Sequence, residues 1–99
     1  TSPSEITRPT AVDVQVSEET LTVRLADGRS IAVPVTWYPR LADGTPVERA
    51  RWELIGSGHG IHWPDLEEDI SVEALLAGRR SSEALSSLKK WVSTRHRRS

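Results

Sequence analysis

The sequence predicts an α+β domain: a small antiparallel sheet of four to five strands, short helices and a longer C-terminal helix. Three observations predict this class. Runs in the N-terminal half alternate apolar and polar residues, which is the period of a half-buried strand. Turn residues separate these runs, and Asp27-Gly28 is a strong hairpin signal because glycine tolerates a positive φ. Near the C-terminus, the apolar spacing becomes that of a helix.

Five segments are predicted as strands. The first three are Ala11–Val16, Thr20–Leu25 and residues 31–35, which carry valine, leucine or isoleucine at alternate positions. We expect them to form an antiparallel meander. Residues 52–55 and Gly60–Trp63 are predicted as two further strands, because a glycine-rich turn separates them.

Capping residues predict two short helices. Thr45 precedes a proline, and Glu48 follows three residues later, which is the pattern of a capping box at the start of a helix over residues 46–51. Ser71 is predicted to cap a second helix, which Gly78 ends.

The clearest helix is predicted over residues 81–95, where apolar residues recur with a period of 3.6. Its apolar face comprises Ala84, Leu85, Leu88, Trp91 and Val92. The predicted organisation is therefore a flexible lead at residues 1–9, an α+β domain at residues 10–80, and an amphipathic helix with a basic tail at residues 81–99.

The composition limits the core. Apolar residues make up 36% of the chain, and phenylalanine and methionine are absent. Tryptophans must therefore supply bulk, and we expect Trp52, Trp63 and Trp91 inside, with Trp37 or Tyr38 partly exposed. So small a core would gain from association of two copies, so a homo-oligomer is among the expected partners.

Other function classes are excluded or disfavoured by what the sequence lacks. Without cysteine there is no disulfide, thiolate zinc site or cysteine nucleophile. No apolar run approaches the roughly 20 residues of a membrane-spanning helix. The first ten residues do not resemble a signal peptide, so we expect a cytoplasmic protein without membrane partners.

Charge is distributed unevenly along the chain. Residues 1–78 carry six arginines against thirteen acidic residues, whereas residues 79–99 carry seven basic residues against one glutamate. This pattern is typical of an interaction tail, of head-to-tail self-association or of contact with nucleic acid. The alternative is a solvated helix end whose cations complement the macrodipole. The nucleic-acid hypothesis depends on Lys89, Lys90, Arg95, Arg97 and Arg98.

Four carboxylates follow Pro64 and predict an acidic turn before a helix: Asp65, Glu67, Glu68 and Asp69. Stabilisation by the helix N-terminus accounts for much of this cluster. The functional interpretation is a docking surface for a basic partner. Trp37, Tyr38 and Arg40 are of the types that dominate binding hot spots, and we expect them beside this turn.

His59 and His62 are the remaining candidates for chemistry. On one strand they would point to opposite faces, and only a bend at Gly60 would bring them together. With Asp65 or Asp69 they would then suit zinc or manganese. The spacing matches no standard ligand pattern, so structural histidines are the favoured interpretation. A metal-dependent enzyme stays an alternative, and no cofactor or catalytic residue is assigned.

Several segments together resemble a bacterial family known as domain of unknown function 2442. They are residues 25–29, 33–41, 51–52 and 60–71, which include the run Gly-Ile-His-Trp-Pro-Asp-Leu-Glu-Glu-Asp-Ile-Ser. The resemblance covers roughly residues 11–80. Family members usually carry aspartate where this chain has Glu67.

The resemblance implies the fold and a narrow set of functions. The family has no established activity, but its small members often lie beside a gene for another short protein, which suggests a toxin–antitoxin-like pair. Longer relatives add a helix-turn-helix module, for which the residues after Gly78 are too few. We therefore expect a non-catalytic interaction module that binds another small protein, encoded by an adjacent gene. A nucleic-acid-binding adaptor is the alternative.

Overall fold

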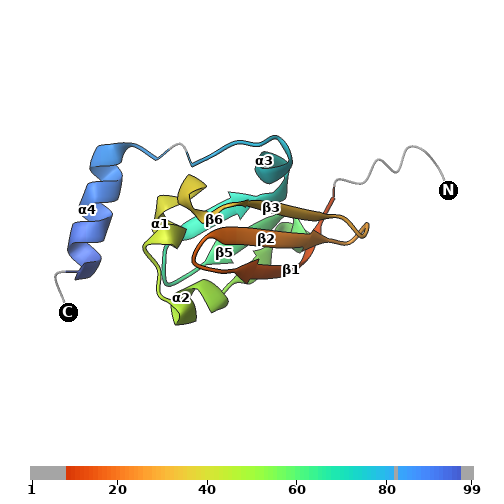
Figure 1. The fold of residues 1–99 in the computed structure, drawn as a ribbon, viewed down its shortest axis with the longest axis horizontal. Coiled ribbons are helices and arrows are strands. Elements are labelled where there is room, and N and C mark those ends of the chain that lie inside the picture. Colours follow the sequence, from red (N-terminus) through yellow and green to blue (C-terminus); the bar gives the residue numbers. More distant parts are fainter. Residues whose placement is uncertain (1–8, 82, 97–99) are drawn as a thin grey trace.

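Two three-stranded antiparallel sheets pack around one core, and a C-terminal helix lies beside them (Figure 1). The structure is a computed structural model that describes residues 9–81 and 83–96. The α+β class is confirmed, but the expected single sheet of four to five strands is wrong. The chain divides into two sheets because three short helices intervene between the third strand and the fourth.

The first sheet is the predicted meander, with strand order β1-β2-β3. Its strands are β1 (Ala11–Val16), β2 (Thr20–Leu25) and β3 (Ser30–Pro34). In the β2–β3 turn, Gly28 has φ +95°, as the hairpin signal requires. A register shift at the start of β1 leaves the side chain of Val12 exposed on the edge.

The second sheet has the order β4-β5-β6 and contains a strand that the sequence did not predict. Its strands are β4 (Glu53–Ile55), β5 (Gly60–Trp63) and β6 (Glu68–Ser71). The β5–β6 turn places Glu67 at φ +51°. Ile70 then pairs with Ile61, and both side chains are buried.

The prediction of an acidic turn running into a helix is thus wrong for Glu68 and Asp69, which lie within β6. Carboxylates are depleted in strands, so this segment gives a weak strand signal. Burial of Ile70 outweighs that local preference, and the inward positions of β6 are those of Glu68 and Ile70.

Short helices join the strands, and their predicted caps are confirmed. They are η1 (Val35–Trp37), α1 (Pro39–Ala42), α2 (Pro46–Ala50), η2 (Gly56–Gly58) and α3 (Val72–Leu76). The hydroxyl of Thr45 accepts from Glu48 N–H, and the Glu48 carboxylate accepts from Thr45 N–H, which completes the capping box. The Ser71 hydroxyl accepts from Ala74 N–H at the start of α3.

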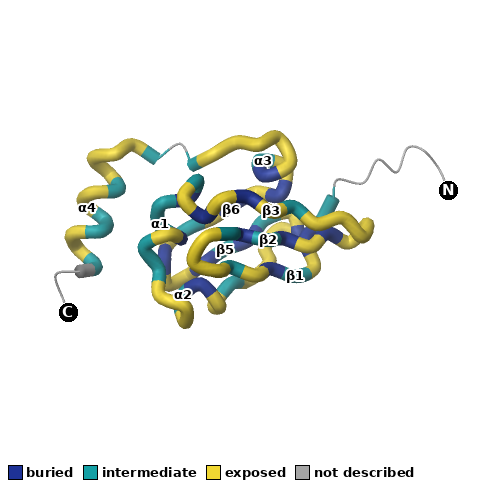
Figure 2. Tube along the Cα trace, in the orientation of Figure 1, coloured by how far each residue is buried: buried dark blue, intermediate teal, exposed yellow. Residues whose placement is uncertain are grey.

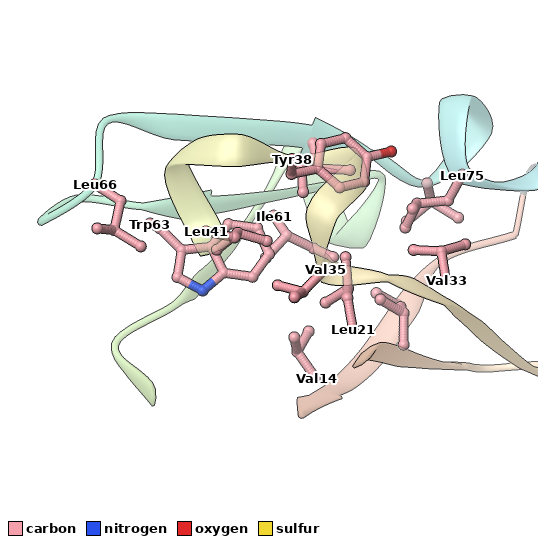
Figure 3. Close-up of a cluster of buried hydrophobic side chains, with 14 of the residues drawn as sticks. Val14, Leu21, Val33, Val35, Tyr38, Leu41, Ile61, Trp63, Leu66 and Leu75 are labelled. Atoms are coloured by element: carbon pink, nitrogen blue, oxygen red, sulfur yellow. The ribbon is translucent and has the colours of Figure 1, made fainter. Parts of the chain in front are cut away.

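The core lies where the two sheets and the short helices meet (Figure 3). Trp63 is fully buried, and its indole N–H donates to the carbonyl of Arg49. The guanidinium of Arg49 donates in turn to the carbonyls of Leu41 and Ala42, both at 2.9 Å, and so ties α2 to α1.

The tryptophan predictions hold only in part. Trp63 is inside as expected, but Trp52 and Trp91 are half-buried and pack on the rim of the core. Trp37 is half-buried, as one of the two expected alternatives, whereas the Tyr38 ring is buried.

The C-terminal helix α4 (Leu85–His96) begins four residues later than predicted and lies beside α1 (Figures 1 and 2). Its residues with described burial are half-buried or exposed, and Leu85 on the predicted apolar face is 65% exposed. Across the part of the chain that the structure describes, no helix has the length and hydropathy needed to span a membrane.

Candidate partner-binding site

A groove of about 350 Å³ lies between β6 and the segment that connects α3 to α4. One wall is formed by Glu67 and the four residues of β6, and the other by Arg79, Arg80, Ser81 and Glu83. Tyr38, Arg40 and Ala74 complete the lining. The groove therefore brings together chain segments about forty residues apart, and a whole strand runs along it.

The wall formed by β6 is a sheet edge. Within residues 9–81 and 83–96, the one strand that pairs with β6 is β5. Val72 N–H donates to His59 C=O, so the pairs 59/72, 61/70 and 63/68 are the hydrogen-bonded ones. The backbone groups of Asp69 and Ser71 then point away from β5, towards the free edge. Among the described residues, no backbone partner occupies the Asp69 carbonyl or the Ser71 N–H.

The Glu68 carboxylate occupies the outward-pointing N–H of Asp69 on this edge. Its Oε1 accepts from Asp69 N–H at 3.1 Å, while its Oε2 is buried and has no hydrogen-bond partner in the described part of the chain. Burial raises the pKa of Glu68, and the nearby charges of Glu83 and Asp69 add to that rise, against the lowering effects of the Asp69 N–H and Arg40. Glu68 is thus a half-buried carboxylate with one of its two oxygens unpaired among the described residues.

Arg40 links the groove to α4. Its guanidinium donates to both oxygens of Glu83, with a shortest N–O distance of 2.5 Å, and to the carbonyl of Glu67. It also forms an ion pair with the Glu67 carboxylate at 3.5 Å and lies over the Trp91 ring, 4.7 Å from its centroid. Arg40 thus lies beside the acidic segment, as expected, but its shorter ion pair is with Glu83. The hydrogen bonds of this pair lower the pKa of Glu83.

Tyr38 and Trp37 fix the segment opposite β6. The Tyr38 hydroxyl donates to the carbonyl of Arg79, and burial together with the charge of Glu68 raises the pKa of Tyr38. The Arg80 guanidinium lies over the Trp37 ring, 4.9 Å from its centroid. Ser81 N–H donates to Trp37 C=O. The hot-spot-like residues of the sequence thus position one wall of the groove.

Of the seven residues predicted to bind a partner, five line the groove and two lie outside it. The five are Tyr38, Arg40, Glu67, Glu68 and Asp69. Trp37 is not part of the lining and stacks under the Arg80 guanidinium, and Asp65 pairs with Arg51 at 3.6 Å. Sequence reasoning missed the other residues of the lining, which are Ile70, Ser71, Ala74, Arg79, Arg80, Ser81 and Glu83. The break between the two C-terminal helices was visible at Gly78, but nothing in the sequence indicated that this break folds back along β6.

The basic residues on which the nucleic-acid hypothesis depends differ in their surroundings. Lys89 and Lys90 are exposed on α4. Arg95 instead pairs with Asp43 at 2.8 Å and with Glu48 at 2.6 Å, and its guanidinium lies over Trp91. Arg97 and Arg98 lie outside the described residues. Arg95 therefore helps to dock the basic helix on acidic residues of its own chain.

The two histidines do not form a metal site with the carboxylates. His62 pairs through Nδ1 with Asp69 across the β5–β6 ladder, while His59 ends η2 and lines a different cavity with Pro9, Ser71 and Glu73. Over residues 9–81 and 83–96, no three histidine or acidic side chains come together as metal ligands.

Comparison with protein families matches residues 11–81 to the family described as "Protein of unknown function (DUF2442)". The chain belongs to this family. The match includes the whole groove except Glu83 and ends before α4, so the family accounts for both sheets and not for the C-terminal helix. A search of curated proteins finds no match.

Two solved structures resemble the chain. A protein of unknown function from Rhodospirillum rubrum has a TM-score of 0.67 and 28% identity, and the alignment covers 79% of this chain and 96% of that one. An uncharacterised protein from Chromobacterium violaceum has a TM-score of 0.65 and 29% identity, over 81% of this chain and 75% of that one. Both support the fold, and neither carries an assigned activity.

Proposed function

We propose that the chain is a non-catalytic interaction module that binds a protein partner by adding one strand of the partner to the free edge of β6. Strand addition uses backbone hydrogen bonds for affinity and side-chain pockets for specificity. The observation that carries the proposal is the open edge of β6 inside a formed groove, where the Asp69 carbonyl and the Ser71 N–H point outward.

The acidic segment flanked by Tyr38 and Arg40, which the sequence suggested as a docking surface, coincides in this groove with the free edge of β6. That coincidence favours strand addition over a flat charged patch. The groove also lies in the part of the chain shared with the family, which supports a role common to its members. An antitoxin-like pairing with the product of an adjacent gene is the narrower form of the proposal.

The experiment compares two substitutions of one residue. Ser71→Pro removes the outward N–H, and φ of −88° at Ser71 is close to the range that proline adopts. Ser71→Ala is the matched control, because it removes the same capping hydroxyl from α3 but keeps the N–H. Each variant is co-expressed with the product of the adjacent gene and examined by native mass spectrometry.

We expect the hetero-complex with wild type and with Ser71→Ala, and its loss with Ser71→Pro while circular dichroism shows a folded chain. A complex that survives Ser71→Pro would rule out strand addition at β6. No complex with wild type would remove the antitoxin-like pairing.

A further inference from the structure

We infer that the groove selects one lysine or arginine in the added strand, and that Glu68 is the residue that recognises it. The inference rests on the proposed strand addition and specifies the partner's chemistry. It follows from the place of the Glu68 carboxylate on the edge, from its unpartnered oxygen and from the charges across the groove.

Glu68 occupies the position that a partner's backbone would take. Its Oε1 accepts from the outward N–H of Asp69, which is the bond that a carbonyl of an added strand would make. An inward-pointing charge at a sheet edge protects the edge from indiscriminate pairing. An incoming strand must therefore displace this carboxylate, and the displaced carboxylate needs a new partner.

The unpaired oxygen of the Glu68 carboxylate would be satisfied by a cation. This oxygen, Oε2, is buried with no donor among the described residues, and a buried acceptor without a partner is costly. Arg40 is close enough to affect the pKa of Glu68, but its nitrogens donate to Glu83 and to the Glu67 carbonyl. A lysine or arginine from the partner would supply charge-assisted hydrogen bonds to both Glu68 oxygens.

The arginines on the side of the groove facing β6 limit the number of cations that a bound partner strand can carry. Arg79 and Arg80 line the groove across from β6, and Arg80 is held in place over Trp37. A polybasic segment would meet these charges along its length. The other carboxylates of the groove already have partners: Glu67 and Glu83 pair with Arg40, and Asp69 pairs with His62. The favoured occupant is therefore an extended, β-branched segment with a single cation, placed opposite Glu68.

The test uses nine-residue threonine- and valine-rich peptides with a fluorescent label. One lysine is moved along the peptide, and in a parallel series norleucine, its uncharged analogue, replaces it. Dissociation constants are measured by fluorescence anisotropy against wild type and Glu68→Ala. Glu18→Ala is the control variant, since Glu18 is an exposed carboxylate in the β1–β2 turn.

For wild type and Glu18→Ala, we expect one lysine position to bind about tenfold more tightly than its norleucine counterpart, in line with a hydrogen bond to a charged group. In Glu68→Ala, the norleucine peptides should bind more tightly than they do to wild type, because the edge is open, and the lysine preference should disappear. A merely structural Glu68 would not produce this exchange of preferences.

The peptide experiment distinguishes failure of the Glu68 inference from failure of the proposed strand addition. Equal binding of lysine and norleucine peptides to wild type would overturn the role of Glu68 and leave strand addition standing. A lysine preference that persists in Glu68→Ala would place the cation elsewhere and overturn the inference. If no peptide of either series binds wild type or Glu68→Ala, strand addition itself fails, and the inference fails with it.

Discussion

The two parts of this chain are held by different forces. Residues 11–81, which match the family, enclose a core of fifteen buried apolar side chains, and the largest of them is Trp63. In α4, no residue with described burial is fully buried (Figure 2), and the helix docks mainly through arginine ion pairs and the two arginine–Trp91 contacts. The sheets should therefore be insensitive to salt and the docking of α4 sensitive to it, because partly exposed ion pairs are screened.

The largest effect is expected in the core. Trp63→Ala should lower the free energy of unfolding by about 3–5 kcal/mol, because it leaves a cavity and removes the donor to the Arg49 carbonyl. Urea unfolding followed by circular dichroism measures this change. A loss below about 1 kcal/mol would mean that the two sheets do not depend on a common core.

A smaller and more local effect is expected at α4. Arg95→Ala removes the ion pairs to Asp43 and Glu48 and should weaken helix docking by about 1–2 kcal/mol, with little change in the unfolding midpoint of the sheets. Amide hydrogen exchange resolves the two parts. Lys90→Ala, on the exposed face of the same helix, is the control. A loss of protection that spreads into β2 or β5 would contradict the separation of the two parts.

Lowering the pH should release α4 before the sheets unfold. Hydrogen bonds from Arg95 lower the pKa of Glu48, and those from Arg40 lower the pKa of Glu83, below the ordinary 4.5. Their contribution is therefore present above pH 4.5 and is lost as the pH falls through the lowered values. The Trp91 indole resonance in an NMR pH titration should report undocking while the Trp63 resonance is unchanged. Simultaneous changes in both would refute this order.

The smallest change in stability is expected for a substitution of Glu68. It should stabilise the chain, whereas the changes above destabilise it. Burial raises the pKa of Glu68, so the native state retains a proton that the unfolded state has lost, and stability falls as the pH rises above 4.5 through the raised value. Glu68→Gln removes this charge and should stabilise the chain by about 1 kcal/mol at pH 7, with a smaller gain at pH 4. Thermal unfolding at the two pH values measures the difference. Destabilisation at pH 7 would show that the ionised carboxylate is already satisfied.

The sequence predicted those features whose causes are local. The period of two in β2 and β3, the Asp27-Gly28 turn and the Thr45–Glu48 capping box depend on neighbouring residues, and all are confirmed. In β1 the strand is confirmed, but the register shift breaks its period of two and leaves Val12 exposed. β6 was missed because its pairing with β5, and not the propensity of its two carboxylates, makes it a strand. The division into two sheets depends equally on contacts between distant segments.

In the candidate site, too, the sequence did not predict the features that depend on contacts between distant segments. The carboxylates and Arg40 were found because charge and residue type are visible in a sequence. Arg79, Arg80 and Ser71 were missed as groove residues because their role depends on the path of residues 79–81 along β6. Hydrogen bonds from Tyr38 to Arg79 and from Ser81 to Trp37 hold that segment in place. Arg95 was a candidate under the alternative nucleic-acid hypothesis, whereas in the structure it pairs with Asp43 and Glu48.

The central claim is that the partner binds to the edge of β6 and not to the basic helix. The most direct measurement is residue-resolved amide hydrogen exchange of the chain, free and bound to the co-expressed partner or to the tightest-binding peptide. We predict that the Ser71 amide exchanges quickly in the free chain and becomes protected on binding, while the amides of α4 keep their free rates. Protection confined to α4, with Ser71 still exchanging quickly, would contradict the account.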